Sequence, residues 1–446
     1  MEGEFIMSRR QLTLFQDTFL NVVISISLLL VWAGDGLAQS REYIDVRAPI
    51  TKKYVIATPK LQGPGGSGPE LGAALAVQAD QDLRLSGHFT VLDPGTYDSS
   101  PIGPSPSTGQ LHSLSALGCN LVIAGGWRQE GGQLVLDLKL IDPGSGQMLV
   151  GKRYRGGAND GQRMMTQFVN EAVLFLTGER GVPQGRLAFI SGGTDIRELY
   201  VMDIGGTPKQ LTRYRTLTLT PSWSPDGQEV FFCSYRGGFP ALYAVNPGSG
   251  SIRKLSTHGT LNVTPAGGPR GLLAATLNKS GDQEIYLLDR QGNIKQRLTQ
   301  SPGIDISPTF SPDGAQLAFV SNRGGNPQIY IVSTGGGQPR RLTFGGTYNV
   351  SPAWSPRGDL IAYASRTGGG FQILVISPQG GGARQITREG SNESPTWSPD
   401  GSFIACSSTR GGTSAIYLVN VKTGTATRLT TMPGAQTQPA WAPGGK

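Results

Sequence analysis

Pro308-Thr-Phe-Ser-Pro-Asp-Gly314 is the stretch of sequence that decides the fold, because related stretches occur five more times in the second half of the chain. The six copies are Pro221-Ser-Trp-Ser-Pro-Asp-Gly227, Pro265-Ala-Gly-Gly-Pro-Arg-Gly271, Pro308-Thr-Phe-Ser-Pro-Asp-Gly314, Pro352-Ala-Trp-Ser-Pro-Arg-Gly358, Pro395-Thr-Trp-Ser-Pro-Asp-Gly401 and Pro439-Ala-Trp-Ala-Pro-Gly-Gly445. Their third positions follow one another at intervals of 44, 43, 44, 43 and 44 residues. A period of about 40–50 residues with several strands in each unit is typical of a β-propeller.

Each repeat reads as four strands. The first strand ends at the aromatic residue, and the turn that follows uses proline to preset φ and glycine to accept positive φ. After the third copy, residues 316–321 and 328–333 are the second and third strands, and a short fourth strand ends in Arg341-Leu-Thr343. The nearly continuous Val, Ile, Leu and Phe of the second and third strands predict burial on both faces, as in stacked blades.

The two ends of the repeat array complement each other. Arg186-Leu-Ala-Phe-Ile-Ser191 opens the array as a second strand without a first, and the chain ends just after Trp441, a first strand without a second. Residues 185–446 number 262, and one sixth of that is 43.7, the observed period. The sequence therefore predicts an all-β six-bladed β-propeller with four-stranded blades, closed by the C-terminal strand, which leaves no open sheet edge.

Composition excludes several classes of protein. The 446 residues include 65 Gly and 30 Pro but only 16% charged residues, which favours many tight turns over disorder or a coiled coil. Three cysteines cannot form a disulfide framework and are expected to be buried thiols, and three histidines lack metal-ligand spacing, so no metal or cofactor is predicted. The net charge is +8, and the basic residues recur once per repeat in turns and at strand edges. No aromatic residues alternate with them to stack on bases, which argues against binding of nucleic acid.

The first 38 residues are expected to be a cleaved signal peptide. Arg9 and Arg10 precede an apolar run at residues 22–32, and small residues follow, so cleavage is placed between Ala38 and Gln39. Either Met1 or Met7 could be the start, and either the general or the twin-arginine export route fits. A single membrane anchor is the alternative, but the apolar run is short for a span.

Residues 39–180 show no repeat and are expected to form a small α/β domain, linked by residues 178–185 to the propeller at 185–446. Residues 54–61, 89–92 and 121–124 read as strands, 133–141 and 148–155 as a hairpin, and 70–86 and 161–177 as helices. Gly63-Pro-Gly-Gly-Ser-Gly68 matches a dinucleotide-binding pattern, but its prolines remove amides that would face a pyrophosphate. We therefore interpret this loop as a surface feature of unassigned role.

The sequence contains no G-x-S-x-G elbow, P-loop or H-E-x-x-H motif, so we expect a protein that is not an enzyme. An exported propeller that binds or cleaves a polysaccharide or peptide is the alternative.

A ring of polar residues is the candidate binding site. Three residues before each repeat proline stands a polar residue, and equivalent positions of first strands form one ring at one mouth of a propeller. The candidate residues are Thr218, Asn262, Asp305, Asn349, Asn392 and Gln436, with His258 in a loop at the same mouth. These positions could grip a protein loop, or they could be ordinary turn residues. A cation near Asp305 and Glu393 in the channel is left open.

A second candidate lies at the mature N-terminus. Residues 40–50 alternate polar and apolar side chains, which suits an extended peptide that adds to a partner's sheet edge or an edge strand of the first domain. The candidate residues are Ser40, Arg41, Glu42, Tyr43, Ile44 and Asp45.

Nearly all of residues 39–446 resembles the TolB family of the periplasmic Tol-Pal system. In the first domain the resemblance rests on Asp82-Leu83, on Ser86-Gly-His-Phe89 and on residues 168–191, and in the propeller on the Ser-Pro-Asp-Gly turns and Arg-Leu-Thr strand ends. Gly267-Gly268 in place of Trp-Ser and the glycine-rich loop depart from the family pattern.

The resemblance implies a periplasmic scaffold and a monomer. In that family the propeller binds the lipoprotein Pal, which makes the scaffold peripheral to the outer membrane, and the mature N-terminus binds TolA. Colicins exploit the same surfaces, and the system supports outer-membrane integrity and constriction at cell division.

Overall fold

The computed structural model describes residues 53–446 except 65–68, 98–100, 180, 280 and 445–446. The expected signal peptide, its cleavage site at Ala38 and Gln39, and the segment Ser40 to Asp45 lie outside the described residues. None of the described helices has the length and apolar content needed to span a bilayer.

The N-terminal part is a five-stranded sheet with helices, in the strand order β2-β1-β3-β4-β5. β1 runs parallel to β2 and β3, and β3, β4 and β5 form an antiparallel meander. Its elements are β1 (Tyr54–Ala57), α2 (Pro69–Ser86), β2 (Phe89–Val91), the 3₁₀ turn η3 (Pro94–Thr96), α3 (Thr108–Ala116), β3 (Leu121–Glu130), β4 (Gln133–Ile141), β5 (Met148–Gly156) and α4 (Gly161–Thr177).

Helices cover both faces of this sheet. On one face α2 and α4 pack Leu75, Leu83 and Phe168 against the sheet, and on the other α3 contributes Leu111 and Leu114 to a smaller cluster. Both long helices were predicted, the helix at 161–177 from its apolar face. The sequence reading missed α3, and it made β1 too long and β3 too short.

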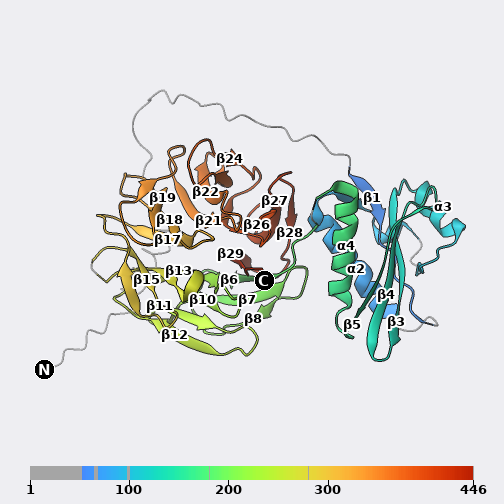
Figure 1. The fold of residues 1–446 in the computed structure, drawn as a ribbon, viewed down its shortest axis with the longest axis horizontal. Helices are drawn as coiled ribbons and strands as arrows, with labels where there is room; N and C mark the ends of the chain where they lie inside the picture. Colours follow the sequence, from blue (N-terminus) through green and yellow to red (C-terminus); the bar gives the residue numbers. More distant parts are fainter. Residues whose placement is uncertain (1–52, 65–68, 98–100, 180, 280, 445–446) are drawn as a thin grey trace. The chain divides into compact units, whose positions relative to one another are not determined.

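The second part is a closed ring of six four-stranded blades (Figure 1). We number them 1 to 6 from the blade that contains β6. Blade 1 holds β29 (Ala435–Trp441), β6 (Arg186–Gly192), β7 (Arg197–Asp203) and β8 (Lys209–Gln210). Blade 2 holds β9 (Thr218–Trp223), β10 (Val230–Gly237), β11 (Phe239–Val245) and β12 (Ile252–Ser256). Blade 3 holds β13 (Asn262–Gly267), β14 (Leu273–Leu277), β15 (Glu284–Leu288) and β16 (Ile294–Arg297), with the 3₁₀ turn η4 (Pro269–Gly271) after β13.

The other three blades follow the same order. Blade 4 holds β17 (Asp305–Phe310), β18 (Gln316–Ser321), β19 (Gln328–Ser333) and β20 (Arg340–Arg341). Blade 5 holds β21 (Asn349–Trp354), β22 (Ile361–Thr367), β23 (Gly370–Ile376) and β24 (Arg384–Gln385). Blade 6 holds β25 (Asn392–Trp397), β26 (Phe403–Ser408), β27 (Ala415–Asn420) and β28 (Ala426–Arg428).

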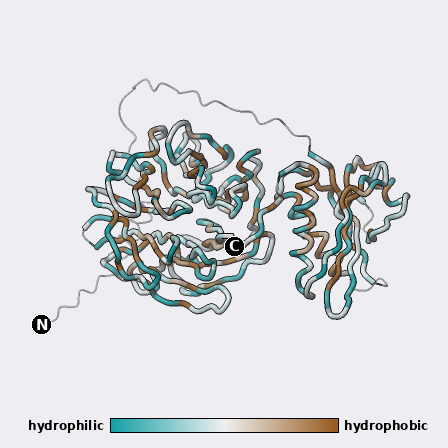
Figure 2. The backbone as a smooth tube through the Cα atoms, viewed as in Figure 1, coloured by the Kyte–Doolittle hydropathy of each residue, from teal (hydrophilic) through white to brown (hydrophobic). Residues whose placement is uncertain are grey.

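The predicted closure of the ring is confirmed. β29 pairs antiparallel with β6, with Gln436 opposite Ser191 and Trp441 opposite Leu187. The second and third strands of the blades are buried on both faces, as their apolar runs predicted, and Figure 2 shows hydrophobic stretches along the strands and hydrophilic ones in the turns. Blade stacking is therefore the source of the propeller core.

Candidate functional site

All six predicted ring residues lie at the start of the innermost strands, but their side chains are buried. The exposed fraction is 1% for Asn262 and 0% for the other five, Thr218, Asp305, Asn349, Asn392 and Gln436. A partner that docks on this mouth would not reach these side chains directly. This burial favours a supporting role for the ring residues, and their assignment to partner binding stays a prediction.

Their hydrogen bonds show what the ring residues do instead. Asn349 Nδ2 donates to Gln328 Oε1 at 2.7 Å and to Gly345 O at 2.8 Å, and Asn392 Nδ2 donates to Gln372 Oε1 at 3.0 Å and to Glu389 O at 2.9 Å. Each bond ties an innermost strand to the outer part of the preceding blade and to the loop between them. The ring residues therefore fix the loops that form the mouth.

The remaining ring residues act in similar ways. Gln436 Nε2 donates to Met432 O at 3.0 Å, within the connecting loop. Asn262 Oδ1 accepts from Ser256 Oγ at 2.9 Å and from the backbone N–H of His258 at 2.8 Å. Thr218 is the exception, since among the described residues its Oγ1 makes only a long contact of 3.5 Å with Ser234 Oγ.

His258, the secondary candidate, is half-buried. Its Nε2 lies 3.1 Å from Gly292 O in the next blade. The imidazole is therefore engaged in blade packing.

The threonine of the Arg-Leu-Thr motif belongs to the same network, which the sequence reading missed. Thr343 Oγ1 donates to Gln328 Oε1 at 2.7 Å and accepts from the Ile329 N–H at 3.0 Å, so it links the fourth strand to the third. Thr387 and Gln372 repeat the first of these bonds at 2.8 Å. A glutamine 15 positions before each of these two threonines was the available signal.

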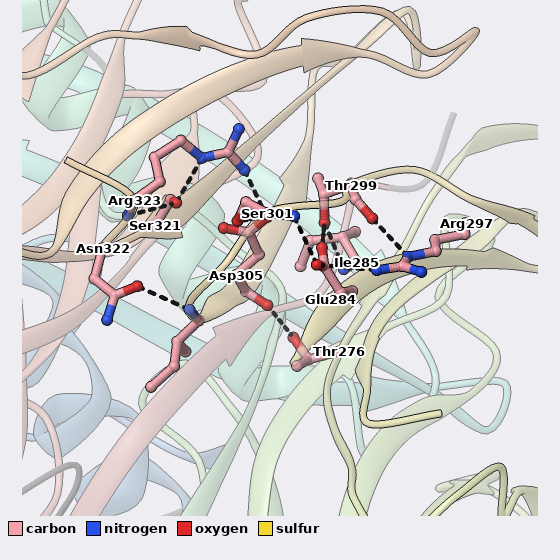
Figure 3. A network of polar contacts seen from close by, with 11 residues as sticks. Thr276, Glu284, Ile285, Arg297, Thr299, Ser301, Asp305, Ser321, Asn322 and Arg323 are labelled. Carbon is pink, nitrogen blue, oxygen red and sulfur yellow. Dashed lines mark hydrogen bonds and ion pairs between the residues drawn. The ribbon is translucent and has the colours of Figure 1, made fainter. Parts of the chain in front are cut away.

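Blades 3 and 4 place two carboxylates in this network (Figure 3). Glu284 accepts from Thr299 Oγ1 at 2.6 Å and from Arg297 at 3.2 Å, while Asp305 Oδ2 accepts from Arg323 at 2.6 Å. Both carboxylates are fully buried. Desolvation raises the pKa of the Asp305 carboxyl above its usual value. Its hydrogen bonds and the positive charge of Arg323 lower the pKa, but by less.

A cation in the channel gains no support from geometry. Within the described ranges no three His, Cys, Asp or Glu side chains come together as metal ligands. Glu393, the other acidic candidate, lies in blade 6, and burial raises the pKa of its carboxyl.

The innermost strands carry a repeated backbone distortion. Each has a β-bulge two residues after the ring position, where a residue other than glycine adopts a φ between 46° and 57°. These residues are Thr220, Thr264, Ser307, Ser351, Ser394 and Gln438. Left-handed φ is unfavourable for such residues, so the surrounding structure must impose it. Side chains of the neighbouring blade do so in two cases, through Thr220 N–H to Gln438 Oε1 at 2.8 Å and Ser307 N–H to Thr264 Oγ1 at 3.3 Å.

The six four-stranded blades and the closing pair β29–β6 define the class of this protein, the six-bladed β-propeller. Buried polar residues hold the loops at its mouth in place. The chain belongs to the TolB family: residues 174–445 match the TolB beta propeller domain and residues 42–149 match the TolB amino-terminal domain.

Similar proteins carry the same family name. A "Protein TolB homolog" from Chlorobium chlorochromatii is 38% identical over 285 residues, 64% of this chain and 64% of the relative. A "Tol-Pal system protein TolB" from Desulfosudis oleivorans is 39% identical over 282 residues, 62% of this chain and 64% of the relative. The matched region thus spans a little under two thirds of these relatives. The crystal structure of TolB from Acinetobacter baumannii is similar with a TM-score of 0.74 at 26% identity, and covers 88% of this chain and 97% of that one.

Proposed function

We propose that this chain is a non-enzymatic periplasmic component of a Tol-Pal system, in which the mouth of the propeller binds the lipoprotein Pal. The observation that carries the proposal is the braced mouth of a TolB-family propeller, in which buried side chains hold the connecting loops in place. Rigid loops lose little conformational entropy when a partner docks, which favours protein recognition. The exposed loop residues make the contact, and the ring residues position them.

The test compares binding with catalysis. Purified Pal without its lipid anchor is passed over the immobilised mature chain, and the same preparation is screened for glycosidase and peptidase activity. Saturable capture of Pal without turnover supports the proposal. Turnover of a polysaccharide or peptide without Pal capture supports the alternative, an exported propeller enzyme.

The mature N-terminal segment is proposed to bind TolA. The alternation of side chains over residues 40–50 supports this, because an extended segment can add to a sheet edge through main-chain hydrogen bonds. Removal of residues 39–43 is expected to abolish TolA binding and to leave the thermal melting curve unchanged. Unchanged TolA binding by the truncated protein contradicts the assignment.

A further inference from the structure

Blades 2, 4 and 6 are closer repeats of one another than of their neighbours. The turn after the first strand is Ser-Pro-Asp-Gly in all three, and their second strands lead into Ser-Tyr-Arg-Gly-Gly, Ser-Asn-Arg-Gly-Gly and Ser-Thr-Arg-Gly-Gly. The arginines of these loops are Arg236, Arg323 and Arg410, each 87 residues after the previous one. Positions 87 residues apart can therefore be compared directly.

The loop arginine is bound internally in blades 4 and 6. Arg323 donates to Asp305 Oδ2 at 2.6 Å, and Arg410 donates to Asn392 Oδ1 at 3.2 Å. Blade 2 has Thr218 at the ring position, which lacks a carboxylate or amide oxygen.

As a result, the guanidinium of Arg236 is exposed. It lies 4.4 Å from the ring centroid of Tyr214 and 5.6 Å from that of Tyr243, and no carboxylate within the described part of the chain pairs with it.

A second basic residue is free in the same blade. In the other five blades an Arg or Gln side chain of the fourth strand donates to the carbonyl of the threonine two positions later, at 2.7–3.0 Å. These donors are Gln210, Arg297, Arg341, Gln385 and Arg428. Blade 2 has Lys254 at this position, and its side chain is exposed and makes no such bond among the described residues.

The side chain of Lys254 leaves open the space that Arg341 occupies in blade 4 and Arg428 in blade 6. A Cβ on Gly324 would lie 3.0 Å from Tyr330 Oη and 3.6 Å from Arg341 Nη1, and Gly411 in blade 6 has the same surroundings. At the equivalent Gly237 no atom of a described residue lies within 4 Å of such an atom.

A pocket of about 300 Å³ lies at this place in blade 2. Phe239, Pro240, Tyr243 and Lys254 are among its lining residues, and none of the lining residues is acidic. Phe239 is 60% exposed at the edge of this pocket, so its ring is accessible to an apolar group of a partner.

We propose that this pocket binds an aspartate or glutamate side chain of a protein partner, together with a neighbouring apolar residue that packs on Phe239. Lys254 lines the pocket, and the guanidinium of Arg236 lies beside it, 5.6 Å from the ring centroid of the lining residue Tyr243. Neither cation pairs with a carboxylate in the described part of the chain, so the two complement an acidic group that sits next to an apolar one. Arginine and aromatic residues are also the side chains that contribute most to protein interfaces. The inference rests on the proposed role of the propeller as a protein-binding module and names the chemistry that blade 2 recognises.

The test uses two blocked peptides, acetyl-Leu-Glu-Phe-amide and acetyl-Leu-Gln-Phe-amide, titrated into the full mature chain and followed by NMR. The glutamate peptide is expected to bind about tenfold more tightly than the glutamine peptide and to lose affinity as salt rises to about 0.15 M. Shifts are expected at Phe239 and Lys254. Equal affinity for the two peptides overturns the proposal.

Two variants that keep the net charge sharpen the test. Lys254→Arg introduces the residue found in blades 4 and 6 and is expected to fill the pocket, and Thr218→Asn gives Arg236 the acceptor that Arg410 has in blade 6. Each is expected to weaken binding of the glutamate peptide about tenfold. Thr218→Val is the matched control, because it adds no acceptor, and it should bind like the wild type. Unchanged affinity in folded Lys254→Arg overturns the proposal even if Thr218→Asn fails to fold.

The same variants separate this inference from the proposed function. If Pal binds the wild type and Lys254→Arg equally well, and the peptides bind without preference, the pocket assignment fails and the scaffold role stands. If the glutamate peptide binds with the expected variant pattern but Pal is not captured, the pocket assignment stands and the proposed partner is wrong.

Discussion

At the scale of single residues, the polar groups near the mouth serve mainly to join neighbouring blades. Gln328 Oε1 accepts from both Asn349 and Thr343, so one amide oxygen connects the innermost strand of blade 5 with two strands of blade 4. Such groups are buried, and a buried polar group without its partner is destabilising. A substitution at the ring is therefore expected to change stability first and partner binding second.

Replacement of Asn349 by alanine tests this. The change leaves Gln328 Oε1 with one donor fewer and Gly345 O without its amide, so the free energy of unfolding is expected to fall by about 1–3 kcal/mol. Urea denaturation followed by tryptophan fluorescence measures the change. Gln291→Ala serves as the control, because Gln291 is exposed in a turn and its side chain makes no hydrogen bond among the described residues. An unchanged midpoint for Asn349→Ala would argue that the ring residue is free to contact a partner.

Asp82 predicts a pH dependence of stability. It is buried in α2, accepts from Thr166 Oγ1 of α4 at 2.6 Å and from Gln78 Nε2 at 3.0 Å, and desolvation raises its pKa from 3.8 to about 6. The folded chain thus holds a proton that the unfolded chain has released. Stability is therefore expected to fall as pH rises from about 4 to about 6, and the penalty persists above that range.

Asp82→Asn removes this titration. A shift of about two pKa units corresponds to about 3 kcal/mol, so the variant should gain up to that amount relative to the wild type between pH 4 and pH 7. Unfolding free energies of both proteins at several pH values in this range provide the measurement. Parallel pH profiles would exclude Asp82 as the titrating group.

At the scale of elements, neighbouring innermost strands are joined in two alternating ways. Odd-numbered blades have alanine four residues after the ring position, and in blades 1 and 5 the indole of the next blade donates to its carbonyl, as Trp397 Nε1 does to Ala353 O at 2.9 Å. Blade 3 is the exception, because the next blade carries Phe310, which has no N–H. Where an even-numbered blade has a hydroxyl there, that oxygen accepts from the next backbone N–H, as Thr396 Oγ1 does from Trp441 at 3.1 Å.

The two kinds of junction predict that replacement of tryptophan by phenylalanine changes stability differently at Trp397 and at Trp441. Trp397→Phe removes the bond to Ala353 O and is expected to cost about 1–2 kcal/mol. Trp441→Phe retains the backbone bond and removes a buried Nε1 that has no partner among the described residues, so it should be neutral or slightly stabilising. Thermal melts of the two variants side by side provide the comparison. Equal losses would show that aromatic packing, and not the indole bond, distinguishes these junctions.

The sequence predicted the blades, their strands and the closing strand because apolar periodicity and turn residues determine them locally. It could not predict that Asn349 and Gln328 meet, since their contact depends on how two blades stack. The helix α3 was missed because Thr108–Ala116 has few apolar residues, although Ser107 and Gln110 form a capping box that marks its start. The pocket of blade 2 was not predicted either. It is recognised only by comparison with blades 4 and 6, where the ring residue accepts from the loop arginine and an arginine stands at the position of Lys254.

At the scale of the whole molecule, the propeller is a ring of three pairs of blades. The intervals of 44 and 43 residues alternate, so equivalent positions in alternate blades are 87 residues apart. The pairs share one architecture, and blade 2 differs from blades 4 and 6 in its free cations. Blade 2 therefore presents a surface that blades 4 and 6 do not repeat, although all three share one set of turns.

Closure of this ring predicts the largest effect of any change in the chain. Truncation after Gly434 removes β29, which pairs with β6 and also supplies Gln438 Oε1 and Ala440 O to blade 2 and the Trp441 N–H to blade 6. Both junctions of blade 1 lose bonds at once, and the exposed edge of β6 becomes a template for association.

The truncated protein is therefore expected to lose its cooperative thermal transition and to aggregate. Near-ultraviolet circular dichroism during heating and light scattering at constant temperature measure the two effects. Truncation after Gly444, which keeps the whole of β29, is the control and should melt like the wild type. A truncation after Gly434 that melts cooperatively at the wild-type temperature would show that the other five blades hold the ring together without the closing strand.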